Sequence, residues 1–260
     1  IARRGKNDVT FVVASDTHFG FEGIEPVNER LIDAVNHVAG KAWPAPMTGA
    51  VGAPRGLVVT GDLTEWGGDD EWARFVAFYG TRGDAKLSVP VYEMIGNHDK
   101  VRGLWVRDRV AERHGGHFYS WQWDDLHLVS LGEAPDDEGL EFLARDLERV
   151  DGDVPIVLFF HLALEGPWST EHWFAEGDYK ERLARLVAGR MVLAIFHGHH
   201  HARGRYAWRG VDVIKPGAAK HSAHSVAVVH VTDERMDVGW LEFDRREWVT
   251  TWGKPLPARR

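Results

Sequence analysis

Five short polar motifs built from Asp, Asn and His are spread over the first 201 of the 260 residues. Their side chains offer carboxylate oxygens, an amide oxygen and imidazole nitrogens, a donor set that suits metal ions such as Mn, Fe or Zn. In chain order the motifs are Asp16-Thr17-His18, Gly61-Asp62, Gly96-Asn97-His98-Asp99, His161 and Gly198-His199-His200-His201. The chain has no cysteine, so thiolate metal sites and disulfides are excluded. The motifs therefore predict a metal centre with oxygen and nitrogen ligands.

The spacing within the motifs also favours metal binding. On an extended segment, residues i and i+2 point the same way, so Asp16 and His18 can reach one cluster from a short stretch of chain. The same spacing separates His199 from His201. In three motifs a glycine precedes the ligand candidate, and we expect it to let the chain turn sharply where a strand becomes a loop.

Each motif directly follows an apolar stretch that is typical of a buried β-strand. These stretches cover residues 9–14, 57–60, 91–95, 156–160 and 191–196. Helices are predicted at 26–40 and at 69–79, the second with Asp69 or Asp70 as its N-cap. This alternation indicates an α/β sheet with largely parallel strands. Ligand sites in such sheets form beyond the carboxyl ends of the strands, so we expect the five motifs to converge.

The second half of the chain shows the same alternation with more hairpins. Residues 117–123 and 126–131 predict an antiparallel pair of strands. Helices are expected at 136–150 and 179–188, and short strands at 205–208, 211–214, 225–231 and 236–243. No repeat, low-complexity tract or linker marks a boundary. Residues 1–260 are therefore expected to form a single domain of two packed sheets with helices outside.

The overall composition bears on partners and compartment. A net charge of −8 argues against broad binding to nucleic acid or to an anionic membrane. No apolar run approaches the length needed to span a bilayer. The N-terminal sequence Ile1-Ala2-Arg3-Arg4 lacks an initiator Met and a signal-peptide core. We therefore expect a soluble protein that is cytoplasmic, or exported after loss of a signal, and the oligomeric state stays open.

The order and spacing of the five motifs resemble those of the calcineurin-like metallophosphoesterase superfamily, over residues 16–201. The resemblance implies an α/β fold: a four-layer αββα sandwich of two mixed β-sheets flanked by helices, with a dinuclear metal site at the C-terminal strand ends. One metal would be bound by Asp16, His18, Asp62 and His201, and the other by Asp62, Asn97, His161 and His199. Asp62 would bridge the two metals together with a water or hydroxide. The family pattern Gly-His-x-His selects His199 and His201, which leaves His197 and His200 as structural neighbours.

The resemblance also implies a reaction. A metal-bridging hydroxide would attack phosphorus, His98 would protonate the leaving alkoxide, and Asp99 would orient the His98 ring. Because Asp follows His98, as in phosphodiesterase-like members, we expect a phosphodiesterase acting on a small-molecule phosphate ester. The alternatives are a phosphomonoesterase of the same fold and, with less support, a nuclease or a non-catalytic scaffold. Arg102, Trp168 and His172 are candidate substrate-binding residues.

Overall fold

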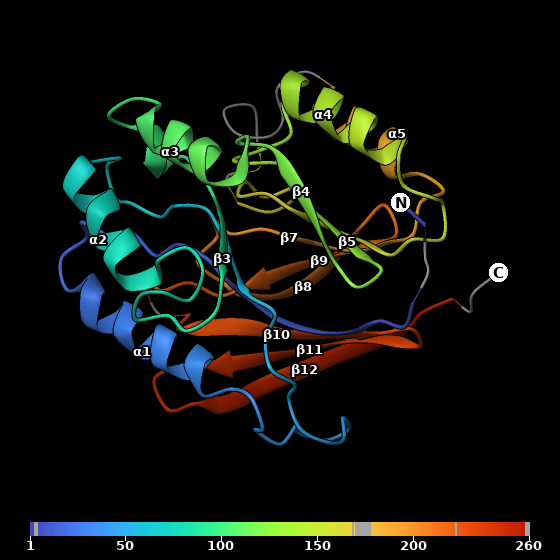
Figure 1. Ribbon diagram of the computed structural model, residues 1–260, viewed down its shortest axis with the longest axis horizontal. Coiled ribbons are helices and arrows are strands. Elements are labelled where there is room, and N and C mark those ends of the chain that lie inside the picture. The colour runs from blue at the N-terminus through green and yellow to red at the C-terminus, as the bar shows by residue number, and fades with distance from the viewer. Residues whose placement is uncertain (3–4, 168, 170–177, 222, 258–260) are drawn as a thin grey trace.

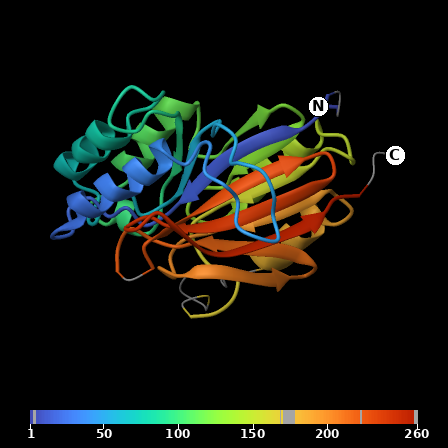
Figure 2. The ribbon, with the colours of Figure 1, turned by 90° about the horizontal axis from the view of Figure 1, so that it is seen from below.

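Two β-sheets packed face to face form the centre of the protein (Figure 1). The computed structural model describes residues 1–2, 5–167, 169, 178–221 and 223–257, and within these residues each sheet has six strands. Figure 2 shows the strands from below, with the helices of the N-terminal half gathered at one side. The mixed α/β fold with two sheets flanked by helices is the architecture expected from the resemblance, and that expectation is confirmed.

The first sheet has the strand order β12-β11-β10-β1-β2-β3. Its strands are β1 (Asp8–Ala14), β2 (Leu57–Thr60), β3 (Val91–Met94), β10 (Ser225–Thr232), β11 (Arg235–Glu242) and β12 (Glu247–Pro255). β1, β2 and β3 run parallel, whereas β10 pairs antiparallel with β1, and β11 and β12 continue antiparallel. The three parallel strands end at the same edge of the sheet and carry the first three motifs there.

The second sheet has the strand order β4-β5-β6-β7-β9-β8. Its strands are β4 (Tyr119–Trp123), β5 (Leu126–Ser130), β6 (Ile156–Phe159), β7 (Val192–Phe196), β8 (Arg203–Trp208) and β9 (Val211–Pro216). β5, β6, β7 and β9 are parallel, and β4 and β8 are antiparallel edge strands. The predicted hairpin is the β4–β5 pair. The last two motifs follow β6 and β7, at the carboxyl ends of these parallel strands.

Strand β1 shows why both faces of a sheet are apolar. Val9, Phe11 and Val13 pack in the core between the two sheets. Val12 and Ala14 pack in the core beneath the helices. Successive side chains of a strand point to opposite faces, so a continuous apolar run is needed to fill both cores.

Within the described residues, five α-helices cover the outer faces of the sheets (Figure 1). They are α1 (Ile24–Asn36), α2 (Asp69–Tyr79), α3 (Trp105–His114), α4 (Asp137–Leu147) and α5 (Tyr179–Val187). The first three pack on the first sheet, and α4 and α5 pack on the second. A short 3₁₀ helix, His98–Lys100, follows β3. No helix in this part of the chain combines the length and the apolar character needed to cross a bilayer.

Some local predictions differ from the structure. α3 was not predicted, because it buries only two valines and is otherwise mostly charged. β12 was not predicted either, since its side chains are exposed or half-buried and form no apolar run. The predicted N-cap of α2 at Asp69 or Asp70 is wrong. The N-cap is Gly68, whose backbone N–H donates to Glu71 Oε2 at 3.0 Å.

Candidate metal centre

The five predicted motifs meet at one edge of the two sheets. Backbone hydrogen bonds join the motif loops, since Asp16 N donates to Gly61 O at 3.1 Å and Gly198 N donates to His161 O at 3.1 Å. The two sheets are also connected, because the His161 ring donates through Nδ1 to Thr60 O at 2.8 Å. The backbone therefore holds the ligand candidates together.

Asp16, His18, Asp62 and His201 form the first set of ligand candidates, one of three such groups among the described residues. The group made of His18, Glu65 and His98 lacks Asp62. His201 Nε2 lies 3.3 Å from Asp16 Oδ1, and His18 Nε2 lies 3.4 Å from Asp62 Oδ2. The two imidazole nitrogens face each other at 3.3 Å. The ligand atoms of all four residues lie within 4.8 Å of one another. This is the set that was predicted for one metal.

Asp62, His161 and His199 form the second set, with the same close spacing. His161 Nε2 lies 3.3 Å from Asp62 Oδ2 and 3.1 Å from Asn97 Oδ1, so Asn97 joins this set. The single oxygen Asp62 Oδ2 is thus close to an imidazole of each set, His18 and His161. The structure brings all seven predicted ligands together, with Asp62 between the two sets.

The polar atoms of the two sets lack the partners that a closed hydrogen-bond network would provide. Asp16 Oδ2 and His201 Nδ1 are buried and have no hydrogen-bond partner within the described residues. Two Nε2 atoms that face each other can share at most one proton, so hydrogen bonding alone leaves part of the first set unsatisfied. Carboxylate, amide and imidazole donors that converge in this way suit Mn, Fe or Zn. The residues present therefore fit two metal ions.

The electrostatics differ among the histidines of the centre. Burial pushes the pKa of His161 down, but the neighbouring Asp62 carboxylate outweighs burial and raises this pKa to about 10. Burial would raise the pKa of Asp62, yet the charges of His161 and His18 hold it well below its usual range. In contrast, burial lowers the pKa of His199 to about 3. A proton on His161 thus occupies a place where a cation is favoured, and a bound metal would displace it.

The backbone at the centre is strained. Five of the seven ligand candidates have the left-handed φ values that non-glycine residues rarely adopt: Asp16 56°, His18 45°, Asp62 50°, His199 65° and His201 46°. The expected sharp turn at a preceding glycine is found at Gly61, with φ 89°. Gly96 and Gly198 instead allow neighbouring side chains to lie close to the backbone. An added Cβ would lie 2.2 Å from Asp62 Oδ1 at Gly96 and 1.9 Å from Ser15 Oγ at Gly198.

His98 lies beside the two ligand sets and is held by backbone atoms. Its Nδ1 donates to Glu65 O at 2.7 Å, since a carbonyl oxygen can only accept. Its own backbone N–H donates to Asp62 Oδ1 at 2.9 Å. The T-shaped contact of the His98 ring with His18, at 4.7 Å between centroids, fixes the ring next to the first set.

Asp99 does not orient the His98 ring, so this expectation is wrong. Its buried carboxylate accepts hydrogen bonds from the backbone N–H groups of Leu63, Thr64 and Gly96 and from the Thr64 hydroxyl, at 2.7–3.1 Å. Burial and the charge of Asp62 raise its pKa to about 7. Asp99 therefore ties together the loops that follow β2 and β3, while the ring of its neighbour His98 is hydrogen-bonded to the backbone of Glu65.

A comparison with known protein families identifies the family of this chain. The family described as calcineurin-like phosphoesterase matches residues 9–203. The chain belongs to this family. It is therefore a metal-dependent phosphoester hydrolase, and the predicted resemblance is confirmed.

Solved structures share the fold of this phosphoesterase. A dimetal phosphatase from Danio rerio has a TM-score of 0.71 at 14% identity, covering 96% of this chain and 99% of that chain. A purple acid phosphatase from yellow lupin has a TM-score of 0.68 at 13% identity, covering 96% and 54%. GAP50, the anchor in the inner membrane complex of Plasmodium, has a TM-score of 0.67 at 9% identity, covering 98% and 90%. No curated protein sequence matches the chain.

Two charged residues of the phosphoesterase's centre were missed by the sequence analysis. Glu65 Oε2 accepts a hydrogen bond from His18 Nδ1 at 2.7 Å. Lys220 Nζ donates to Glu65 Oε1 at 2.9 Å and to Oε2 at 2.8 Å. Burial would raise the pKa of Glu65, but His18 and Lys220 lower it to about 2. A signal for Glu65 exists in its position three residues after Asp62, whereas Lys220 follows no motif.

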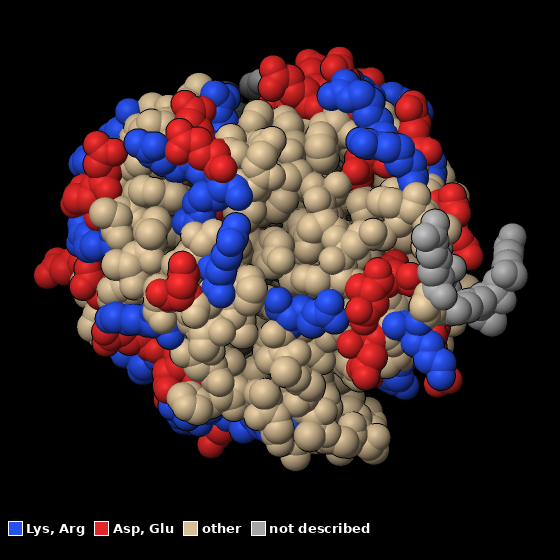
Figure 3. All heavy atoms as spheres, viewed as in Figure 1, with Lys and Arg blue, Asp and Glu red and all other residues tan. Residues whose placement is uncertain are grey.

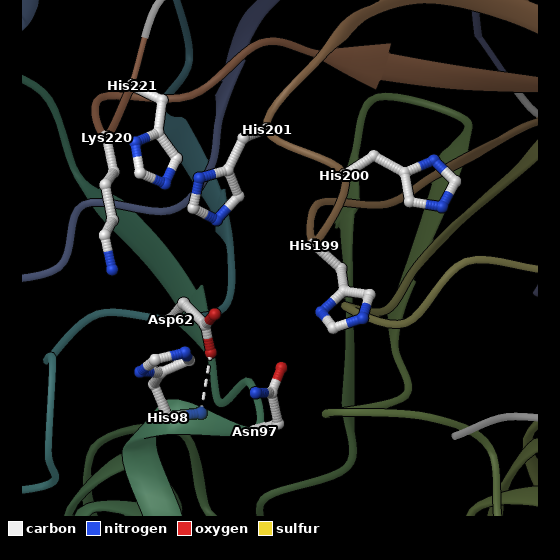
Figure 4. Close-up of a pocket in the computed structure, with 8 residues that line it drawn as sticks. All are labelled: Asp62, Asn97, His98, His199, His200, His201, Lys220 and His221. Atoms are coloured by element: carbon white, nitrogen blue, oxygen red, sulfur yellow. Dashed lines mark hydrogen bonds between the residues drawn. The ribbon is translucent and has the colours of Figure 1, made fainter. Parts of the chain in front are cut away.

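A cavity of about 440 Å³ opens over the centre of the phosphoesterase. Its walls, drawn in Figure 4, are Asp62, Asn97, His98, His199, His200, His201, Lys220 and His221. His200 Nε2 donates to Pro167 O at 2.6 Å, although the ring also lines the cavity. His197 is buried and contacts the Tyr206 hydroxyl at 3.0 Å, and burial lowers its pKa to about 3. Neither residue is in the two ligand sets.

The predicted substrate-binding residues have different outcomes. Arg102 is exposed on the loop after His98, and its backbone N–H donates to Trp66 O at 3.2 Å. It is not among the residues that line the cavity. Trp168 and His172 lie outside the described residues.

On the face of the phosphoesterase drawn in Figure 3, basic and acidic side chains are interspersed, and no broad basic area is seen.

Proposed function

We propose that this phosphoesterase hydrolyses a small-molecule phosphate ester, with phosphodiesters as its first substrate class, at two metal ions. One ion would be held by Asp16, His18, Asp62 and His201, and the other by Asp62, Asn97, His161 and His199. The observation that carries the proposal is the position of Asp62 Oδ2, which lies 3.4 Å from His18 Nε2 and 3.3 Å from His161 Nε2. One carboxylate oxygen placed between two sets of ligands suits a centre in which two metal ions lie close together.

Two bound ions of Mn, Fe or Zn would supply a water of lowered pKa and neutralise charge on the phosphoryl oxygens. The protein supplies the leaving-group proton. Because Nδ1 of His98 is occupied by Glu65 O, Nε2 is the nitrogen that can carry a proton to the leaving oxygen. The backbone contact of His98 to Asp62 fixes this ring relative to both ligand sets. Asp99 supports the same geometry indirectly, by holding the loops.

The size of the cavity supports a small-molecule substrate. A volume of about 440 Å³ falls within the range of small-ligand pockets. Asp, not Glu, follows His98, which supports a diester. A monoester is the alternative, because the Danio rerio and lupin proteins with similar folds are called phosphatases. Arg102 is proposed to meet the part of the substrate that extends beyond the cavity, since this residue is exposed on the loop after His98.

Elemental analysis and two chromogenic esters test this proposal. We expect two metal ions per chain, and faster Mn²⁺-dependent hydrolysis of bis-p-nitrophenyl phosphate than of p-nitrophenyl phosphate. The reverse ratio would establish the monoesterase alternative. Loss of activity on chelation and its return with Mn²⁺ would tie hydrolysis to the metals. Absence of metal-dependent hydrolysis of both esters, across Mn²⁺, Fe²⁺ and Zn²⁺, would contradict the proposal.

A further inference from the structure

Lys220 is a buried cation in the cavity wall, and the reaction described above does not use it. It is 7% exposed and follows β9 in the loop that leads to β10. Among the described residues that line the cavity, it is the only Lys or Arg. Figure 4 shows its side chain extending along the side of the cavity where Asp62 and His98 lie. Its charge is therefore placed next to the centre and not at the outer surface.

Several contacts fix the position of the Lys220 ammonium. The backbone N–H of Lys220 donates to Asp16 O at 3.1 Å, which anchors the loop to the first motif. The ammonium donates to both oxygens of Glu65, and the Phe21 ring lies 4.6 Å from Nζ. A side chain held in this way has already lost most of its conformational freedom. Binding through it therefore costs little further ordering.

The Lys220 ammonium retains one unused donor. An ammonium group has three N–H bonds, and Glu65 accepts two of them. The third N–H has no acceptor among the described residues, and Lys220 lines the cavity. The Glu65 carboxylate, 2.8 Å away, balances the charge of the buried ammonium. A phosphoryl oxygen in the cavity would be a suitable acceptor.

We propose that Lys220 donates its third N–H to a non-bridging oxygen of the phosphoryl group bound at the centre. This inference rests on the proposed function, because it requires a phosphate group beside the two ligand sets. The competing role is purely supportive: Lys220 could hold only Glu65, which in turn orients His18 through Nδ1. The two roles predict different results, since the first acts on phosphate and the second acts on metal binding.

Direct binding of orthophosphate to the Mn²⁺-loaded protein separates the two roles. Lys220→Met removes the charge while keeping much of the side-chain volume. We expect this variant to retain two metal ions per chain and to bind orthophosphate about 10- to 100-fold more weakly by calorimetry, as for a lost hydrogen bond to a charged group. Lys220→Arg should restore part of the affinity, because it restores a charged donor.

Lys254→Met is the matched control. Lys254 is also a partly buried lysine in an ion pair, with Nζ 2.6 Å from Asp212 Oδ2, but it does not line the cavity. We expect its orthophosphate affinity to equal that of the wild type. Should Lys220→Met fold poorly, Lys220→Gln keeps a donor for Glu65 and allows the same comparison.

Two outcomes would overturn the inference. In one, Lys220→Met keeps both metals and binds orthophosphate as tightly as the wild type. In the other, it loses metal, which assigns Lys220 to the support of His18. Failure of the proposed function looks different. The wild type would then hydrolyse neither ester, and a Lys220-dependent affinity for orthophosphate would still establish the anion site.

Discussion

Two places among the described residues bury histidine beside aspartate, and they differ in how their polar atoms are satisfied. The second place lies between the second sheet and α4, and none of its residues belongs to a motif. There His127 Nε2 donates to Asp146 Oδ2 at 2.6 Å, and Ser120 Oγ donates to Asp146 Oδ1 at 2.8 Å. Each carboxylate oxygen has one donor. Of the side-chain polar atoms of these three residues, only His127 Nδ1 lacks a partner within the described residues.

The metal centre shows the opposite pattern. One oxygen of Asp62 faces two imidazoles, and the Nε2 atoms of His18 and His201 face each other. A structural His–Asp pair uses its donors and acceptors on each other, whereas a ligand set directs several lone pairs at the same space. Both places contain buried His and buried Asp. The direction of the lone pairs is what distinguishes a site that binds a cation from one that stabilises the fold.

The largest expected effect comes from the same substitution made in each place. Asp62→Asn removes the carboxylate shared by the two ligand sets, so we expect both metal sites to be emptied or scrambled. Hydrolysis should fall by at least about 10⁴-fold, because both ions contribute to the reaction. Asp146→Asn is the control and should retain two metals and normal hydrolysis. Full metal occupancy in Asp62→Asn, measured by elemental analysis, would contradict the bridging assignment.

His98→Ala should separate proton transfer from metal binding within the centre itself. We expect the variant to keep both metals, because His98 belongs to neither of the two sets that share Asp62, and the group it forms with His18 and Glu65 lacks that carboxylate. Turnover should fall by about 10²–10⁴-fold, the usual contribution of a general acid. The loss should be smaller for esters with good leaving groups, since these need no proton. Loss of metal from this variant, or equal losses for good and poor leaving groups, would refute the role of His98.

The second place should respond in stability and not in activity. Asp146→Ala leaves His127 and Ser120 without their buried acceptor, so we expect the free energy of unfolding to fall by about 2–4 kcal/mol. Urea denaturation measures this change. The kcat and the metal content should match those of the wild type. A variant that is fully stable but inactive would show that the two places are not independent.

The smallest expected effect is a pH dependence in the second place. Burial would raise the pKa of Asp146, but the hydrogen bond from His127 outweighs it and keeps the pKa below its usual value. A carboxylate with a lowered pKa in the folded state stabilises the fold above its unfolded value of about 3.9, and the contribution is lost as pH falls through the folded pKa.

The difference in unfolding free energy between wild type and Asp146→Asn should therefore be constant near neutrality and shrink below about pH 4. Both proteins would be measured after chelation, so that metal binding does not enter the difference. If the difference in unfolding free energy instead grew as the pH fell, the pKa of Asp146 would be raised in the folded state and not lowered.

The strands and the edge at which the ligand candidates meet were predictable because both depend on local patterns, whereas the division of the ligands into two sets came from the family resemblance. Apolar runs marked the strands, and a polar motif at the end of each run marked the shared edge. His161 illustrates this, since a single histidine became a ligand candidate only because it directly follows a predicted strand. The ranking of His199 and His201 over His197 came from the family pattern, and the burial of His197 against Tyr206 agrees with it.

What the sequence did not indicate depends on contacts between distant segments or on the direction of a side chain. Glu65 and Lys220 are paired across 155 positions, and neither lies in one of the motifs. The role of Asp99 was predicted incorrectly because the adjacent side chains of Asp99 and His98 bind different groups: Asp99 binds the loops after β2 and β3, and His98 binds the Glu65 backbone. α3 is held by few buried residues, so its apolar periodicity is weak.

The left-handed φ values of the ligand residues mean that metal binding is gained at the expense of folding stability. At Asp16, His18, Asp62, His199 and His201 the chain adopts a conformation that costs an L-residue roughly 1–3 kcal/mol and costs glycine almost nothing. Glycine at any of these positions would delete a ligand and relax the backbone in the same step. Selection for thermal stability alone would thus favour glycine at these positions and remove the metal ligands. Only selection for hydrolysis would keep Asp and His there.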